Sequence, residues 1–150
     1  MLAARARGGR IYGDVPATER YFSGGATFHR GFGERRLAPS VTGPIDGETY
    51  TVPYGGAELF ESNVEVRTRI GHVKGMGVGG VAFLDGGDVV DLDQHVDLGN
   101  LHWAAGLGLR LFTIIGAVRA DLGYRLNRTG FMEPEPDSKF AFHLSIGEAF

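Results

Sequence analysis

Two residues of opposite charge, Arg30 and Asp85, are the strongest candidates for a specific contact in this sequence. Arg30 lies between Phe28 and Phe32 in a long segment without periodicity, and Asp85 ends a glycine-rich, alternating stretch. A guanidinium and a carboxylate form charge-assisted hydrogen bonds, which are bidentate in the best geometry. The alternative is that Arg30 is a solvated loop residue and Asp85 an acid at the end of a strand.

Other patterns that could support catalysis or cofactor binding each lack a required part. A glycine-rich motif resembles a dinucleotide fingerprint, but no amphipathic helix follows it; its glycines are Gly75, Gly77 and Gly80. The acidic residues at positions 85, 88, 91 and 93 lack the spacing and the closing glutamate of a calcium loop. The five histidines are scattered without zinc-ligand spacing, and no Gly-x-Ser-x-Gly motif occurs. We therefore expect no enzyme activity, no metal site and no cofactor.

Composition narrows the class of protein further. The 150 residues suffice for one domain, and a net charge of −3 argues against nucleic-acid binding. There are no cysteines, so disulfides are excluded. No apolar run approaches the roughly 18 residues of a spanning helix, and the first residues lack the apolar core of a signal peptide. Either the chain is cytosolic or it is the last part of a longer protein.

Alternation with a period of two residues predicts an all-β, antiparallel fold. The expected strands are residues 2–12, 57–70, 75–85, 101–112, 117–127 and 140–150. On strand after strand, one face is apolar and the other carries Arg, Asp, Glu and Gly together, which is typical of transmembrane β-barrels with a polar lumen. Phe83 and Asp85 share the face opposite Leu84, so we expect both to face the lumen.

The connections between these strands alternate between long and short. Residues 14–56, 86–100 and 127–139 form the long connections, and residues 71–74 and 113–117 the short ones. Long extracellular loops and short periplasmic turns are the usual asymmetry of outer-membrane barrels, and they predict a periplasmic C-terminus. A soluble antiparallel barrel of the lipocalin type explains the alternation but not this asymmetry. The long segment 14–56 is rich in aromatic and basic residues and requires a packing surface.

The segment RYFSGGATFHRGF, residues 20–32, resembles the signature loop of the BamA/TamA-type outer-membrane assembly factors, the bacterial surface antigens. Arg30, Gly31 and Phe32 match the end of its aliphatic-Arg-Gly-aromatic tetrad, and His29 stands where an aliphatic residue is usual. The family's Phe-x-Asp-x-Gly element falls on Phe83, Asp85 and Gly87. Three more stretches match in the same order: residues 55–67, 106–126 and 142–150.

This resemblance implies that the whole chain, residues 1–150, is the last six strands and the signature loop of a sixteen-stranded outer-membrane barrel. It implies that the loop inserts into the lumen and is locked there; the residues concerned are Arg30, Gly31, Phe32, Phe83, Asp85 and Gly87. It also implies a C-terminal assembly signal formed by Phe142, Leu144, Ile146, Gly147 and Phe150. Because open sheet edges are not tolerated in hydrocarbon, we expect the chain to be a fragment of a longer protein or a truncated gene product.

The function that the resemblance implies is non-enzymatic insertion or translocation of proteins at the outer membrane. The barrel would open at a lateral seam beside residues 140–150, where a client strand pairs with the exposed edge. The expected partners are outer-membrane lipid, nascent outer-membrane proteins and, through domains upstream, assembly-machinery lipoproteins or other periplasmic proteins. Two alternatives stay open: a two-partner-secretion transporter and a passive barrel or surface antigen.

Overall fold

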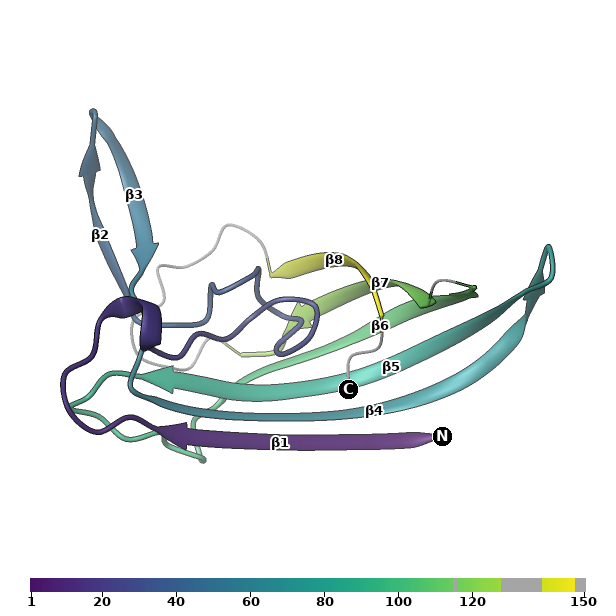
Figure 1. Cartoon of the computed structure of the whole chain (residues 1–150), viewed down its shortest axis with the longest axis horizontal. Coiled ribbons are helices and arrows are strands. Elements are labelled where there is room, and N and C mark those ends of the chain that lie inside the picture. The colour runs from purple at the N-terminus through teal and green to yellow at the C-terminus, as the bar shows by residue number, and fades with distance from the viewer. Residues whose placement is uncertain (115, 128–138, 148–150) are drawn as a thin grey trace.

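The computed structural model describes residues 1–114, 116–127 and 139–147. Six antiparallel strands form one curved sheet in the order β1-β4-β5-β6-β7-β8 (Figure 1). The all-β, antiparallel architecture predicted from the sequence is therefore confirmed, and the sheet is an open part of a barrel wall. The strands of this sheet are β1 (Leu2–Arg10), β4 (Glu58–Val73), β5 (Met76–Val90), β6 (His102–Thr113), β7 (Gly116–Arg125) and β8 (Phe140–Ile146).

Burial in this sheet is the reverse of that in a soluble protein. The face that carries the charged residues is buried, with Asp85 and Asp121 fully inaccessible to solvent. The opposite face is apolar and exposed, as at Leu107 and Leu144, each 69% exposed. This is the sidedness of a barrel with a polar interior and a lipid-facing exterior. Leu84, which alternation placed opposite Phe83 and Asp85, is 40% exposed, whereas those two residues are buried.

Strand β5 extends five residues beyond its predicted end at Asp85. Residues 86–90 stay paired with β4, from Gly86 opposite Ser62 to Val90 opposite Glu58. All five are buried, so this stretch has no exposed face and its sequence shows no alternation. Residues 148–150, which the prediction included in the last strand, lie outside the described residues.

The long segment before β4 contains a hairpin that the sequence analysis did not predict. Strands β2 (Ser40–Ile45) and β3 (Glu48–Pro53) pair with each other and project away from the main sheet (Figure 1). Asp46 and Gly47 connect them with φ angles of 51° and 87°. Two consecutive positive φ angles are those of a type I′ turn, for which Asp-Gly is a preferred sequence.

The remainder of the segment, residues 11–39, contains the short 3-10 helix η1 (Ala17–Glu19) and then lies against the inner face of the sheet (Figure 1). Isolated bridges between Tyr21 and Gly56 and between Ser23 and Leu37 close this segment into a compact loop. Residues 20–39 are called the inner loop below. Across the described residues, no helix has the length and apolar character needed to cross a membrane.

Candidate functional site

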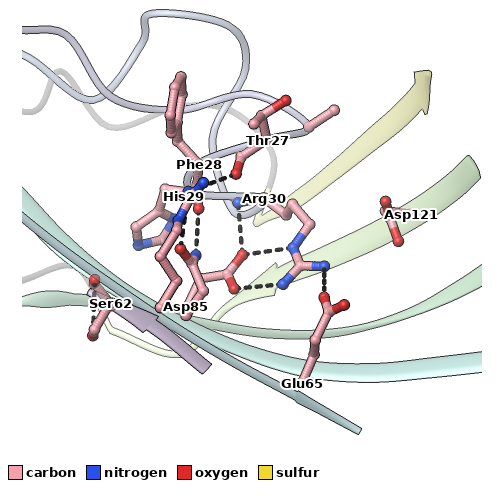
Figure 2. Close-up of polar contacts among 12 residues, drawn as sticks. Thr27, Phe28, His29, Arg30, Ser62, Glu65, Asp85 and Asp121 are labelled. Carbon is pink, nitrogen blue, oxygen red and sulfur yellow. Dashed lines mark hydrogen bonds and ion pairs between the residues drawn. The ribbon is translucent and has the colours of Figure 1, made fainter. Parts of the chain in front are cut away.

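The tip of the inner loop is bonded to the barrel wall through Arg30 and Asp85. The Arg30 side chain donates from Nε to Asp85 Oδ2 at 2.8 Å and from Nη2 to Asp85 Oδ1 at 2.7 Å. The backbone N–H of Arg30 also donates to Asp85 Oδ2, at 2.9 Å (Figure 2). The pair that the sequence suggested is thus a bidentate contact with a third, main-chain hydrogen bond. The alternative of a solvated Arg30 does not hold, since its side chain is only 2% exposed.

Two further wall residues complete the surroundings of the Arg30 guanidinium. Nη1 donates to Glu65 Oε2 on β4 at 2.7 Å, and the guanidinium carbon lies 3.6 Å from the ring centroid of Phe83. Burial alone would lower the pKa of Arg30, but the hydrogen bonds and charges of Asp85 and Glu65 outweigh it and raise the pKa above its ordinary value. Arg30 is therefore held as a cation by two carboxylates and an aromatic face.

Gly31 and Phe32 fit beside Arg30 because the wall leaves little room there. A Cβ on Gly31 would lie 2.5 Å from Ala104 Cβ, which is far inside normal contact distance. Phe32 is buried, and its ring meets those of His29 and His102 edge-on at centroid distances of 4.9 and 5.5 Å. The Arg125 guanidinium carbon lies 4.0 Å from the Phe32 ring centroid. The three residues of the tetrad match are thus packed as one unit against the wall.

The backbone of the loop tip is held as firmly as its side chains. Carbonyl oxygens of residues 26, 27, 28 and 31 accept hydrogen bonds from side chains on three strands: Arg119 (2.6 Å), Arg5 (2.9 Å), Asn63 (2.5 Å) and Arg125 (2.7 Å). His143 Nε2 on β8 lies 3.2 Å from the carbonyl oxygen of Arg30. A loop without regular structure has carbonyl groups that need partners once water is excluded. The polar wall supplies them here.

His29 stands where the aliphatic-Arg-Gly-aromatic tetrad has an aliphatic residue. Among the described residues, its ring makes one hydrogen bond. Its Nε2 lies 3.0 Å from the backbone oxygen of His102, and no described residue hydrogen-bonds its Nδ1. The side chain is buried, and this burial lowers the pKa of His29 below its ordinary value, despite the opposing effect of the His102 carbonyl. The ring is therefore neutral in the folded loop at neutral pH and donates from Nε2.

Gly87 supports the loop from a second point on the wall. It lies opposite Glu61, and a Cβ there would be 2.8 Å from the Phe60 carbonyl oxygen. Glu61 in turn accepts hydrogen bonds from Ser23 on the inner loop and from Arg7 on β1. Arg7 lies 3.8 Å from the ring centroid of Phe28, so this group holds the preceding part of the loop.

The structure separates the loop contacts from the proposed C-terminal signal. Phe142, Leu144 and Ile146 lie on the exposed outer face of β8, opposite the face from which His143 contacts the Arg30 carbonyl. Gly147 follows the strand with φ of 109° and donates its N–H to the Ala117 carbonyl at 2.8 Å. Phe150 lies outside the described residues.

Sequence reasoning did not find the wall residues that hold the loop carbonyls, nor Glu65 as the second acid. The available signal was the repeated occurrence of Arg, Asn, Glu and His on the polar face of four strands; the residues missed are Arg5, Asn63, Glu65, Arg119, Arg125 and His143. Within residues 1–114, 116–127 and 139–147, no three His, Asp or Glu side chains gather as a metal site would require. What the described site provides chemically is immobilisation of a loop by buried ion pairs.

A family model matches the part of the chain that contains these strands and the inner loop. The Omp85 superfamily domain matches residues 2–150, which is nearly the whole chain. The chain belongs to the Omp85 superfamily. Members of this superfamily insert proteins into the outer membrane or secrete them across it, and in general they are not enzymes. Membership implies that the Omp85 chain described here is an outer-membrane β-barrel protein. A sequence comparison with curated proteins gave no match.

Proposed function

We propose that this Omp85 chain is the C-terminal part of a BamA/TamA-type assembly factor that inserts client proteins into the outer membrane. The observation that carries the proposal is the inner loop, whose Arg30 is bonded to Asp85 and Glu65 inside the barrel wall. A loop held in this way occupies the lumen and obstructs passage through it. Insertion at the side of the barrel needs no open lumen, whereas secretion through the pore requires the loop to leave.

The proposed working edge is β8. Within the described residues this strand has seven residues and pairs with β7 along all of them, whereas β4 and β5 have 16 and 15 residues. A short edge strand has few ladder hydrogen bonds to break, which favours opening at this position. A client strand then adds to the exposed edge by β-augmentation, and its apolar face continues the lipid-facing surface of β8. The short turns, and with them the C-terminal end of β8, face the periplasm in this proposal.

The experiment uses the complete protein that contains this chain, reconstituted in liposomes with an unfolded outer-membrane protein as client. A photo-crosslinking residue replaces Ala141 on β8 in one sample and Val66 on β4 in a matched control. We expect client insertion, measured by protease protection and heat-modifiable gel mobility, and crosslinks from position 141 but not from position 66.

Other outcomes distinguish the competing functions. Transfer of a soluble partner into the liposome interior, without insertion, would identify a secretion transporter. Insertion no faster than in empty liposomes would identify a passive barrel. Equal crosslinking from positions 141 and 66 would contradict a seam at β8.

We also propose that residues of the last segment of the chain form the signal by which the barrel itself is assembled; they are Phe142, Leu144 and Ile146 on the outer face of β8, together with Gly147 and Phe150. Deletion of Phe150 is expected to reduce the rate at which pulse-labelled protein reaches the heat-modifiable form. The thermal stability of barrel already assembled is expected to change little. A normal assembly rate without Phe150 would refute this role.

A further inference from the structure

The outer face of the sheet is hollowed by an apolar groove of about 590 Å³. Its lining comes from β4, β5, β6, β7 and β8, and β1 takes no part in it. The large apolar side chains around the groove are all between 47% and 69% exposed; they are Val66, Leu107, Leu109, Leu122 and Phe142. The groove therefore opens outward, on the side of the wall opposite the inner loop.

Small residues on β5 form the floor of the groove. Ala82 lies opposite Val66 on β4 and Leu107 on β6. Gly80, the next outward position of β5, lies opposite Leu109. Because neighbouring strands are about 4.8 Å apart, β4 and β6 lie about 10 Å apart on either side of β5. Between their larger side chains, β5 supplies only a methyl group and a hydrogen atom, so a channel about one strand wide remains.

A second small residue extends the groove toward β8. Ala120 on β7 lies opposite Leu109 on one side and Leu144 on the other. Phe142 on β8 closes this end of the groove. Apart from the hydroxyl of Thr68, no polar side chain belongs to the described lining. The groove thus offers contacts to an apolar occupant and almost none to water.

The position of the groove decides which apolar occupant reaches it. Membership of the Omp85 superfamily implies an outer-membrane barrel, and this face of the sheet is its lipid-facing side. Exposed apolar residues continue the face beyond the groove in both directions along the strands, as at Leu84 and Ile146. No water is present in the hydrocarbon region to fill a hollow. An unbranched hydrocarbon chain that enters gains dispersion contacts with both walls of the channel.

We propose that the groove holds part of one acyl chain of a membrane phospholipid. Such a chain is narrow enough for a channel one strand wide, and it bends to follow Ala82, Gly80 and Ala120. A second copy of the protein fits less well, because Leu107 and Phe142 project on either side of the hollow and would hold a facing wall away from it. The proposal rests on the outer-membrane location and not on the proposed assembly function.

The test uses the complete protein in phospholipid liposomes with a trace of photoactivatable phospholipid, which carries a diazirine near the methyl end of one acyl chain. After illumination, mass spectrometry measures the labelling of Leu107, which lines the groove, and of Ile146, which lies outside it. The two side chains are 69% and 68% exposed, so general contact with lipid labels them alike. We expect Leu107 to be labelled several-fold more strongly than Ile146.

Filling the groove should remove this excess. Ala82→Leu and Ala120→Leu each place a larger side chain in the hollow, and labelling of Leu107 should fall to that of Ile146. Ala105→Leu is the matched control, because Ala105 lies on the same face, opposite Leu84, but does not line the groove. It should leave the excess unchanged. Heat-modifiable gel mobility checks that each variant is folded.

Equal labelling of Leu107 and Ile146 in the wild type would overturn the proposal, as would an excess that persists in both groove variants. Weak labelling of Leu107 in a protein that sediments as a dimer would also overturn it, and would identify a second copy as the occupant. The wild-type measurement gives a decision even if a variant fails to assemble.

Discussion

A Cβ atom on Gly123 would lie 2.1 Å from the carbonyl oxygen of Arg30. Strand β7 and the loop tip are therefore in backbone contact, and only a residue without a side chain fits between them. Gly106 has a similar position, since a Cβ there would lie 2.2 Å from the Phe83 ring. The Arg30 guanidinium stacks on this ring. These glycines bring the wall close enough to reach the main chain of the loop.

Replacing Gly123 with Ala should displace the inner loop. The atoms in the way are backbone atoms of Arg30 and Gly31, so no side-chain rotation relieves the contact. Added protease should then cleave residues 26–36 in the folded barrel. Gly43→Ala is the control, because a Cβ at Gly43 meets nothing within 4 Å. Equal protection of the two variants would show that the close contact is not needed.

Removing either partner of the Arg30–Asp85 pair should release the loop. A buried charge that loses its partner costs about 3–5 kcal/mol, more than most loop contacts provide. Arg30→Ala and Asp85→Ala should each expose residues 26–36 to protease, and the double variant should be less affected than the sum of both. Arg30→Lys keeps the charge without the bidentate geometry and should recover part of the protection. Full protection in both single variants would mean that other contacts hold the loop.

Arginine on the outer face should impair the barrel. Leu107 and Leu144 are both 69% exposed on the apolar face, and an arginine near the bilayer midplane of a barrel costs about 2–4 kcal/mol. Leu107→Arg and Leu144→Arg should lower the denaturant midpoint of the folded protein in lipid vesicles. Leu98→Arg, a change at a similarly exposed leucine (64%) in the connection before β6, should have little effect. Unchanged midpoints for all three would contradict the lipid-facing assignment.

Acid should weaken docking of the inner loop through His29. Its pKa is lowered in the folded loop, so the released loop binds a proton more readily than the docked one. The contribution of neutral His29 to the stability of the docked loop is therefore fully present above the ordinary histidine pKa of 6.5. It declines as the pH falls below that value. Protease sensitivity of residues 26–36 should rise between about pH 6.5 and 5. His29→Leu should lack this rise; a rise of the same size in that variant would exclude His29 as its cause.

The sequence predicted the parts of the fold that follow simple periodicity. Phe83 and Asp85 were assigned to the face opposite Leu84 because a strand alternates, and in the structure they are buried while Leu84 is exposed. Arg30 was paired with Asp85 from charge and the family pattern, and the two side chains are in contact. Periodicity cannot show which wall residues meet an irregular loop, because that depends on the loop's path, so Asn63 and Arg125 were missed.

The β2–β3 hairpin was missed for a different reason. Thr42, Tyr50 and Thr51 suit strands, and Asp46-Gly47 is a strong hairpin signal. However, the side chains that the structure describes in these two strands lie largely in solvent, so they form no buried face that would make alternation visible. Turn chemistry, not hydrophobic pattern, is the signal that finds such an element.

The attachments of the inner loop are unequal across the sheet. Strands β1, β4, β5 and β7 hold it through arginine, asparagine or carboxylate groups, several of them charged. Among the described residues, β8 reaches it only through His143 and a single 3.2 Å contact. The loop thus acts as a brace fastened to most of the wall and barely to its last strand. If β8 separates from β7, the hydrogen-bond ladder between these two strands breaks, but among the described residues the inner loop loses only this one contact, so the brace stays attached to the strands that remain.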